Sequence, residues 1–159
     1  MKREERKICC RRSLVNSSSS PRAPQGIKIE QHITEQFAKS NGLWLPLDAI
    51  FELGVLGPSG NENDTYVADD AVFKVNNLFN CGCITGLLEK VLLHNTLFPN
   101  TAYNLFGFTG CDGRSVLPIL QQNRVSNARP ATQVMIGTYM AALGFTKTDH
   151  EGRLQKEKK

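Results

Sequence analysis

Two short turns between β-forming segments most strongly limit how this chain can fold. Residues 64–76 contain two runs rich in β-branched and aromatic residues, separated by the acidic turn ADD. Residues 101–122 repeat this pattern around Asp112-Gly113, a pair that strongly favours a hairpin turn. Strands joined by so short a connection must run antiparallel, because parallel neighbours need a long crossover. The two hairpins therefore predict an antiparallel sheet.

The segment before the first hairpin has the apolar spacing of a helix. Within residues 27–42, Ile29, Ile33 and Phe37 recur every four positions and therefore share one helical face. Gly42 follows as a stop signal, since glycine is common just beyond the end of a helix. We expect a helix here.

The clearest helix lies between the two hairpins, over residues 83–98. Pro99 blocks its continuation, because proline cannot donate the next helical hydrogen bond. A third helical pattern covers residues 131–145 and ends near Gly144. The apolar stripe of the 83–98 helix consists of Ile84, Leu87, Leu88, Val91 and Leu92.

The order of helix, hairpin, helix, hairpin and helix predicts an α+β fold. We expect a small twisted antiparallel sheet with the amphipathic 83–98 helix packed on it and further helices at its flanks. Residues 43–57, which are apolar and interrupted by Pro46, are ambiguous between a short helix and a strand. Pro118 lies inside the last strand and indicates an edge strand or a bulge.

The positive charge of the chain is concentrated at its two ends. The net charge is +4, but residues 26–146 hold seven Lys/Arg against ten acidic residues, whereas residues 1–25 hold seven against two. A nucleic-acid-binding domain usually carries its positive charge on the folded part, so nucleic acid is not an expected partner. The composition predicts a disordered basic Ser/Pro-rich leader at 1–26, a folded domain at 27–146 and a charged disordered tail at 147–159.

Membrane insertion and a disulfide framework are also disfavoured. No apolar run approaches the roughly eighteen residues that span a bilayer, so we expect no membrane association. The five cysteines form an odd set without a secretory signal, which fits ordinary thiols and a cytoplasmic location. A zinc site at Cys81, Cys83, His94 and Cys111 is disfavoured, because the one close pair is spaced more tightly than structural zinc ligands usually are.

Lys74 is unusual because it lies in a strand beside the apolar residues Phe73 and Val75. Desolvating an ammonium is costly, so a half-buried lysine needs an anion or a route to water. Glu89, in the following helix, is the nearest candidate partner. Two simpler interpretations stay open: Lys74 extends its head group to solvent, and Glu89 is an ordinary exposed helix residue.

The segments around these residues resemble the protein-kinase-like domain found in polyvalent proteins of phages and mobile elements. The resemblance is carried by GPSGNENDTYV, AVFKVNN, LLEKVLLHNTLFPNTAYNLFGFTG and GRSVLPILQQ, and it covers about residues 30–145. It implies the N-terminal lobe of a kinase plus the first helix beyond the hinge, with ATP and Mg²⁺ as cofactors.

The resemblance also implies a nucleotide site. The loop 57–62 would cover the phosphates, Lys74 would contact the α- and β-phosphates with Glu89 as its partner, and the segment ILQQNRV at 119–125 would lead into the adenine-contacting hinge. The nucleotide-binding residues implied in this way are Gly57, Gly60, Asn61, Glu62, Lys74, Glu89 and Gln121.

The chain departs from the kinase pattern at two places. The loop has two glycines where kinases have three, and the sequence after Gly144 lacks the H-R-D-x-x-x-x-N and D-F-G settings. Asp149-His150 has the reverse order and no Asn four or five residues later. We therefore expect a truncated kinase-like domain with weak nucleotide binding and no phosphoryl transfer by itself, which a separately encoded C-terminal lobe could restore. The alternative is a non-catalytic interaction module that docks a protein partner through an exposed apolar surface.

Overall fold

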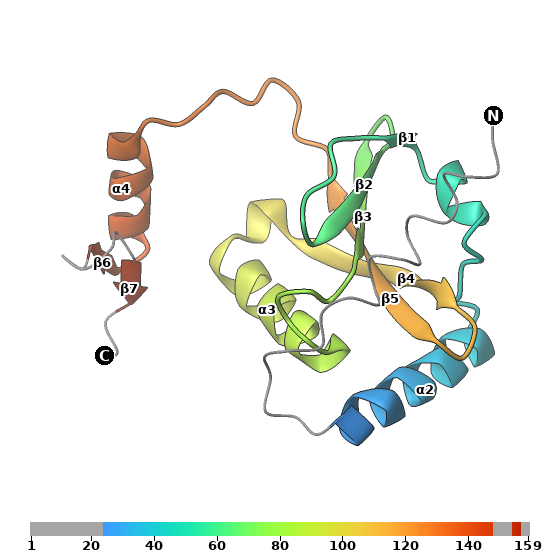
Figure 1. The fold of residues 1–159 in the computed structure, drawn as a ribbon. Helices are drawn as coiled ribbons and strands as arrows, with labels where there is room; N and C mark the ends of the chain where they lie inside the picture. Colours follow the sequence, from blue (N-terminus) through green and yellow to red (C-terminus); the bar gives the residue numbers. More distant parts are fainter. Residues whose placement is uncertain (1–23, 148–153, 157–159) are drawn as a thin grey trace. The chain divides into compact units, whose positions relative to one another are not determined.

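The computed structural model describes residues 24–147 and 154–156. The chain divides into two units, and the boundary along the sequence lies between Arg124 and Val125. Each unit is described by itself. The first unit has the predicted α+β fold, with one five-stranded antiparallel sheet and helices packed on it (Figure 1).

Both predicted hairpins are present in the sheet, whose strand order is β1-β2-β3-β5-β4. The β2–β3 turn is closed by the Ala68 amide donating to the Ala71 carbonyl, and the β4–β5 turn contains Gly113 at a positive φ of 68°. Turn chemistry therefore identified both connections correctly. The strands are β1 (Val55–Leu56), β2 (Asn63–Val67), β3 (Ala71–Asn76), β4 (Tyr103–Cys111) and β5 (Ser115–Asn123).

The strand that contains Pro118 is central, so the prediction of an edge strand is wrong. β5 lies between β3 and β4, and Pro118 is opposite Phe108 of β4. Pairing with β3 begins only at Ile119, so the missing N–H of the proline falls just outside that ladder. A bulge is present nearby, between Leu105 and Gly107 of β4.

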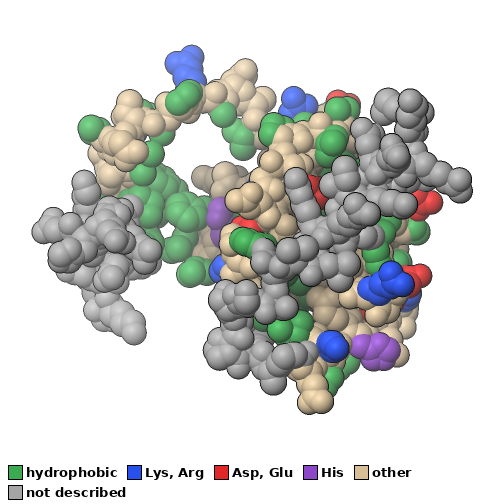
Figure 2. Space-filling model, in the orientation of Figure 1, with side chains coloured by type: hydrophobic (Ala, Val, Ile, Leu, Met, Phe, Trp, Pro, Cys, Tyr) green, Lys and Arg blue, Asp and Glu red, His purple; other side chains and the backbone are tan. Residues whose placement is uncertain are grey.

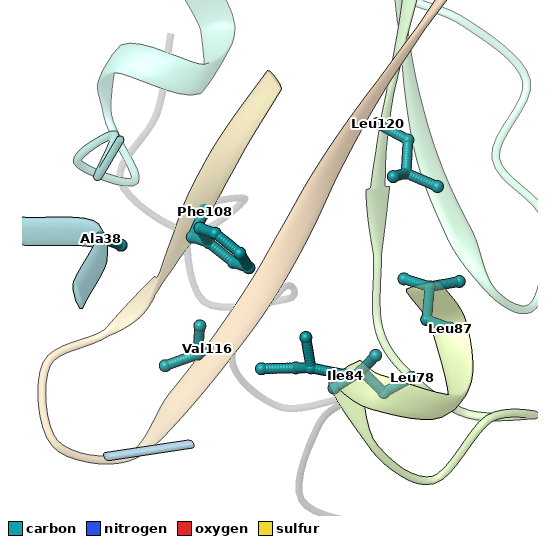
Figure 3. Packing of buried hydrophobic residues seen from close by; sticks show 7 residues of the cluster. All are labelled: Ala38, Leu78, Ile84, Leu87, Phe108, Val116 and Leu120. Atoms are coloured by element: carbon teal, nitrogen blue, oxygen red, sulfur yellow. The ribbon is translucent and has the colours of Figure 1, made fainter. Parts of the chain in front are cut away.

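One face of the sheet is covered by helices α2 (Pro24–Ser40) and α3 (Ile84–Leu97). Figure 3 shows side chains from both helices and from β4 and β5 converging on a common core. Burial of this apolar surface is the main force that holds α3 on the sheet. The buried members of the cluster are Ala38, Leu78, Ile84, Leu87, Phe108, Val116 and Leu120.

The opposite face of the sheet has a second core under the segment that the sequence left ambiguous. This segment forms the short helix η1 (Ala49–Glu52) and strand β1, so both alternatives are realised in part. Ala71, Phe73 and Val75 of β3 point into this core. Because side chains alternate along a strand, Lys74 lies on the other face, toward α3. The remaining buried members are Ile50, Tyr66, Leu117 and Ile119.

The predicted apolar stripe of α2 does not face the core. Ile29, Ile33 and Phe37 are 59, 58 and 54 % exposed, whereas Ala38 on another face of the helix is fully buried. The helix itself is confirmed and ends before Gly42, which has a positive φ of 68°. The stripe is therefore a surface feature of the first unit.

Polar side chains attach α2 to the rest of the unit instead. Gln31 exchanges two hydrogen bonds with the backbone of Val116 in β5, and Glu35 accepts from the amide of Gly113 in the β4–β5 turn. Glu30 accepts from the first amides of α3. These bonds fix the rotation of α2 about its axis, and this rotation turns the apolar stripe outward.

The second unit contains the predicted third helix, α4 (Gln133–Ala142). Thr132 caps its start by accepting from the amide of Met135, and Gly144 follows its end with a positive φ of 81°. Apolar side chains gather over this helix on the surface shown in Figure 2.

Two short strands follow α4 and were not predicted. β6 (Phe145–Lys147) pairs antiparallel with β7 (Leu154–Lys156), so the end of β6 and all of β7 lie in the segment 147–159 that was expected to be a disordered tail. Three-residue strands in a lysine-rich segment leave little pattern in the sequence. The predicted leader, apart from its last three residues, and the rest of the predicted tail lie outside the described residues.

Two further predictions concern cysteines and membranes. Cys81 and Cys83 are not disulfide-bonded, but Cys111 is, so the prediction of ordinary thiols is wrong there. Pairing depends on which segments meet in space, and cysteine spacing does not show this. Within the described ranges, no helix is long and apolar enough to cross a bilayer.

Candidate functional site

Lys74 is placed by β3 on the sheet face that α3 covers. It is half-buried and lies opposite Leu120 of β5. Its Nζ donates to the Tyr103 hydroxyl at 2.8 Å and to Gln122 Oε1 at 3.3 Å, and it lies 4.8 Å from the centroid of the Tyr103 ring. A hydroxyl, an amide oxygen and an aromatic face thus satisfy the ammonium group without a carboxylate.

The partners of Lys74 are themselves held by a polar network. Gln122 Nε2 donates to the Thr101 carbonyl at 2.6 Å, and His94 Nε2 lies 3.0 Å from the same oxygen. The His94 and Tyr103 rings pack together with their centroids 4.8 Å apart. Asn95 exchanges two hydrogen bonds with the backbone of Tyr103, which ties α3 to β4. The network fixes the hydroxyl that contacts Lys74.

A cavity of about 270 Å³ lies between α3 and the sheet around Lys74. Residues from the start of β2, from β3, from α3 and from β4 and β5 contribute to its walls. Among the described residues, the charged side chains in the wall are two lysines and one glutamate, and its other titratable groups are a thiol, an imidazole and a phenol. The lining residues are Glu62, Asn63, Lys74, Asn76, Cys81, Leu87, Lys90, Val91, His94, Tyr103 and Leu120.

The loop 57–62 connects β1 to β2 and leads into this cavity. Its carbonyls at Asn61 and Glu62 accept from Asn77, and the amide of Gly57 donates to a β2 carbonyl, so both ends of the loop are fixed. A Cβ atom added at Gly60 would meet no atom within 4 Å. Packing inside the protein therefore does not require glycine at this position, and the space around it is open.

Glu89 is exposed and does not line the cavity. α3 turns Leu87, Lys90 and His94 toward the cavity instead. At roughly 100° per residue, Glu89 lies about 200° around the helix from Leu87, which is almost the opposite face. The ion pairs in which both partners are described residues are Lys39–Glu35 and Lys39–Asp112, so the predicted Lys74–Glu89 pair is absent.

Gln121 is also separated from Lys74. It lies opposite Phe73 in the β3–β5 ladder, so its side chain is on the other sheet face. Its neighbour Gln122 is on the Lys74 face and makes the contact with the ammonium. Of the predicted residues, the structure thus brings Glu62 and Lys74 together at one cavity.

The residues at this cavity and its network that were not predicted as site residues include Lys90, His94, Tyr103 and Gln122. The helical phase carried a signal for the first two, because positions 87, 90, 91 and 94 share one face of any helix. Tyr103 and Gln122 had no comparable signal, since their position depends on the pairing of β4 with β5.

A comparison with protein families shows that residues 28–159 match the family described as serine/threonine/tyrosine kinases found in polyvalent proteins. No match is found among curated proteins or among solved structures. The matched range includes the β1–β2 loop, Lys74 on β3 and the helix α3 that follows. Because the match covers more than half of its length, the chain belongs to this family of polyvalent-protein kinases.

Proposed function

We propose that this chain binds a nucleoside triphosphate, with its phosphates between the 57–62 loop and Lys74. The observation that supports this most directly is the position of the Lys74 ammonium at a cavity below the loop, with neutral partners only. Such an ammonium can exchange a hydroxyl and an amide oxygen for phosphate oxygens, because phosphate carries an opposite charge that these neutral acceptors lack. Membership of a kinase family supports the same role for a lysine on this strand.

The size of the cavity favours the phosphates over the whole nucleotide. Its volume of about 270 Å³ is just under the roughly 300–1,000 Å³ of typical small-molecule sites. The base and ribose would then lie outside it. Its wall has one carboxylate, Glu62, so Mg²⁺ would arrive bound to the phosphates and not in a cage of protein ligands.

We also propose that this chain alone does not transfer the phosphoryl group. Transfer requires a catalytic aspartate, a metal-binding asparagine and a second metal-binding aspartate in defined positions. Among the residues in ranges 24–147 and 154–156, no aspartate lines the cavity. Positioning and charge stabilisation supply nearly all of this catalysis, so binding without these groups gives little acceleration.

The test is calorimetric titration of the full chain with a non-hydrolysable ATP analogue, using Lys74→Ala and, as a control, Lys28→Ala. Lys28 is an exposed lysine on α2, away from the cavity. Loss of hydrogen bonds to a charged group of about 1.5–3 kcal/mol corresponds to a roughly 10- to 100-fold weaker affinity for Lys74→Ala. Equal affinities of the wild type and Lys74→Ala would remove the proposal.

The alternative function, a protein-interaction module, is supported by the exposed stripe on α2. Ile29, Ile33 and Phe37 are spaced like the anchors of helices that bind apolar grooves. A contiguous exposed apolar surface of this kind is typical of an interface. Self-association through this stripe is the simplest form of such an interaction and can be measured directly.

A further inference from the structure

The side of α3 that faces Lys74 presents a cation where a kinase has a carboxylate. Lys90 lines the cavity together with Lys74, whereas Glu89 is exposed and does not. The two neighbours point about 100° apart on the helix, so this orientation of α3 brings Lys90 and not Glu89 to the cavity. The chain therefore differs from the kinase pattern in which residue of α3 faces the strand lysine.

The Lys90 ammonium is weakly held. Its Nζ donates to the Asn80 carbonyl at 3.5 Å, which is at the long limit for a hydrogen bond. An ammonium has three donors and a flexible stem, so a phosphate oxygen can replace this contact. Lys90 is therefore available to an anion without loss of a strong internal bond.

The charge of the cavity favours an anion with several negative groups. Lys74 on the sheet side and Lys90 on the helix side oppose the single carboxylate of Glu62. Cations gathered around one small cavity repel each other, and an anion between them relieves this repulsion. A chain of phosphates can contact both lysines, whereas a single phosphate has less reach.

We infer that Lys90 is a second phosphate-contacting residue of this site and that, with Lys74, it selects polyphosphates over monophosphates. This inference rests on the nucleotide binding proposed above. Glu89 has no part in it, and Lys74 needs no carboxylate partner because Tyr103 and Gln122 satisfy it in the absence of ligand. The site would thus hold phosphates between a strand lysine and a helix lysine.

The experiment compares Lys90→Gln with Glu89→Gln in the full chain, by titration with AMP, ATP and inorganic tripolyphosphate. Both residues are exposed neighbours on α3, so neither change should disturb folding, and each removes one charge. Lys90→Gln should weaken ATP and tripolyphosphate binding about tenfold, the low end for a hydrogen bond to a charged group at an exposed position. Its effect on AMP should be small, and Glu89→Gln should bind ATP as the wild type does.

Other outcomes separate the two proposals. If Lys74→Ala loses ATP while Lys90→Gln keeps wild-type affinity, nucleotide binding stands and the role of Lys90 is wrong. The role of Lys90 is also wrong if Glu89→Gln weakens ATP binding as much as Lys90→Gln does. If tripolyphosphate binds with a dependence on Lys90 but ATP does not bind, the anion site stands and the nucleotide function is wrong. If the wild type binds neither, both proposals are wrong.

Discussion

Glu30 should stabilise the fold through α3, although it belongs to a different helix. Its carboxylate accepts from the amides of Ile84 and Thr85 at 3.0 and 2.9 Å and also from the Thr85 hydroxyl. The first amides of a helix have no partner inside the helix, and the helix dipole favours an anion there. Glu30 thus caps α3 across 54 residues of sequence.

The magnitude follows from these contacts. Loss of a helix cap costs about 0.5–2 kcal/mol, and hydrogen bonds to a charged group are worth about 1.5–3 kcal/mol. We expect Glu30→Ala to lower the free energy of unfolding by about 2 kcal/mol. Glu30→Gln keeps one acceptor oxygen, replaces the other with a donor and loses the charge, so it should cost about 1 kcal/mol.

Urea unfolding followed by circular dichroism measures both variants against the wild type. Gln36→Ala is the matched control, because Gln36 is an exposed residue on the same helix. The slope of the unfolding free energy against urea should stay constant, so that a shift in midpoint reports stability. If Glu30→Ala unfolds within about 0.5 kcal/mol of the control, as surface substitutions usually do, the capping argument is refuted.

Three further predictions concern the site, the acid stability and the exposed stripe. Tyr103→Phe removes the hydrogen bond that the nucleotide-free Lys74 ammonium donates to a neutral hydroxyl, which is worth about 1.5 kcal/mol at this half-buried position, so calorimetry should show roughly tenfold tighter ATP binding, and unchanged or weaker binding contradicts this. The hydrogen bond from Lys39 holds the pKa of Glu35 below its ordinary value of 4.5, so this pair stabilises the fold above that value and stops doing so as the pH falls through the lower folded pKa. Glu35→Gln should therefore lose less stability than the wild type in urea unfolding below pH 4.5, and equal losses would oppose this. Ile33→Asp should abolish any self-association seen by light scattering, and a wild type that stays monomeric at all concentrations argues against association through this stripe.

The sequence was most informative where local chemistry decides the structure. The acidic turn before Ala71 and the glycine at 113 specify hairpins through their own backbone preferences, and both hairpins are found. The α+β class follows from their order along the chain. The helix over 83–98 was also correct, since its apolar spacing continues for several turns.

The errors arose where long-range contacts decide. Periodicity showed that Ile33 and its neighbours share a face of α2, but only the bonds from Gln31 to β5 determine that this face points outward. The strand position of Lys74 could be read from the sequence, but its partner Tyr103 lies in a distant strand. The position of Glu89 could have been predicted from the sequence. It lies about 200° around the helix from Leu87, which faces the core, so its side chain points away from the sheet.

The cap that Glu30 places on α3 restricts rotation of this helix about its own axis. Bringing Glu89 to Lys74 would require α3 to roll about its own axis by a large fraction of a turn. The amides of Ile84 and Thr85 are held by a carboxylate on α2, which is in turn bonded to β5 through Gln31. The roll would break these bonds together, so α2 acts as a latch that keeps α3 in its present orientation.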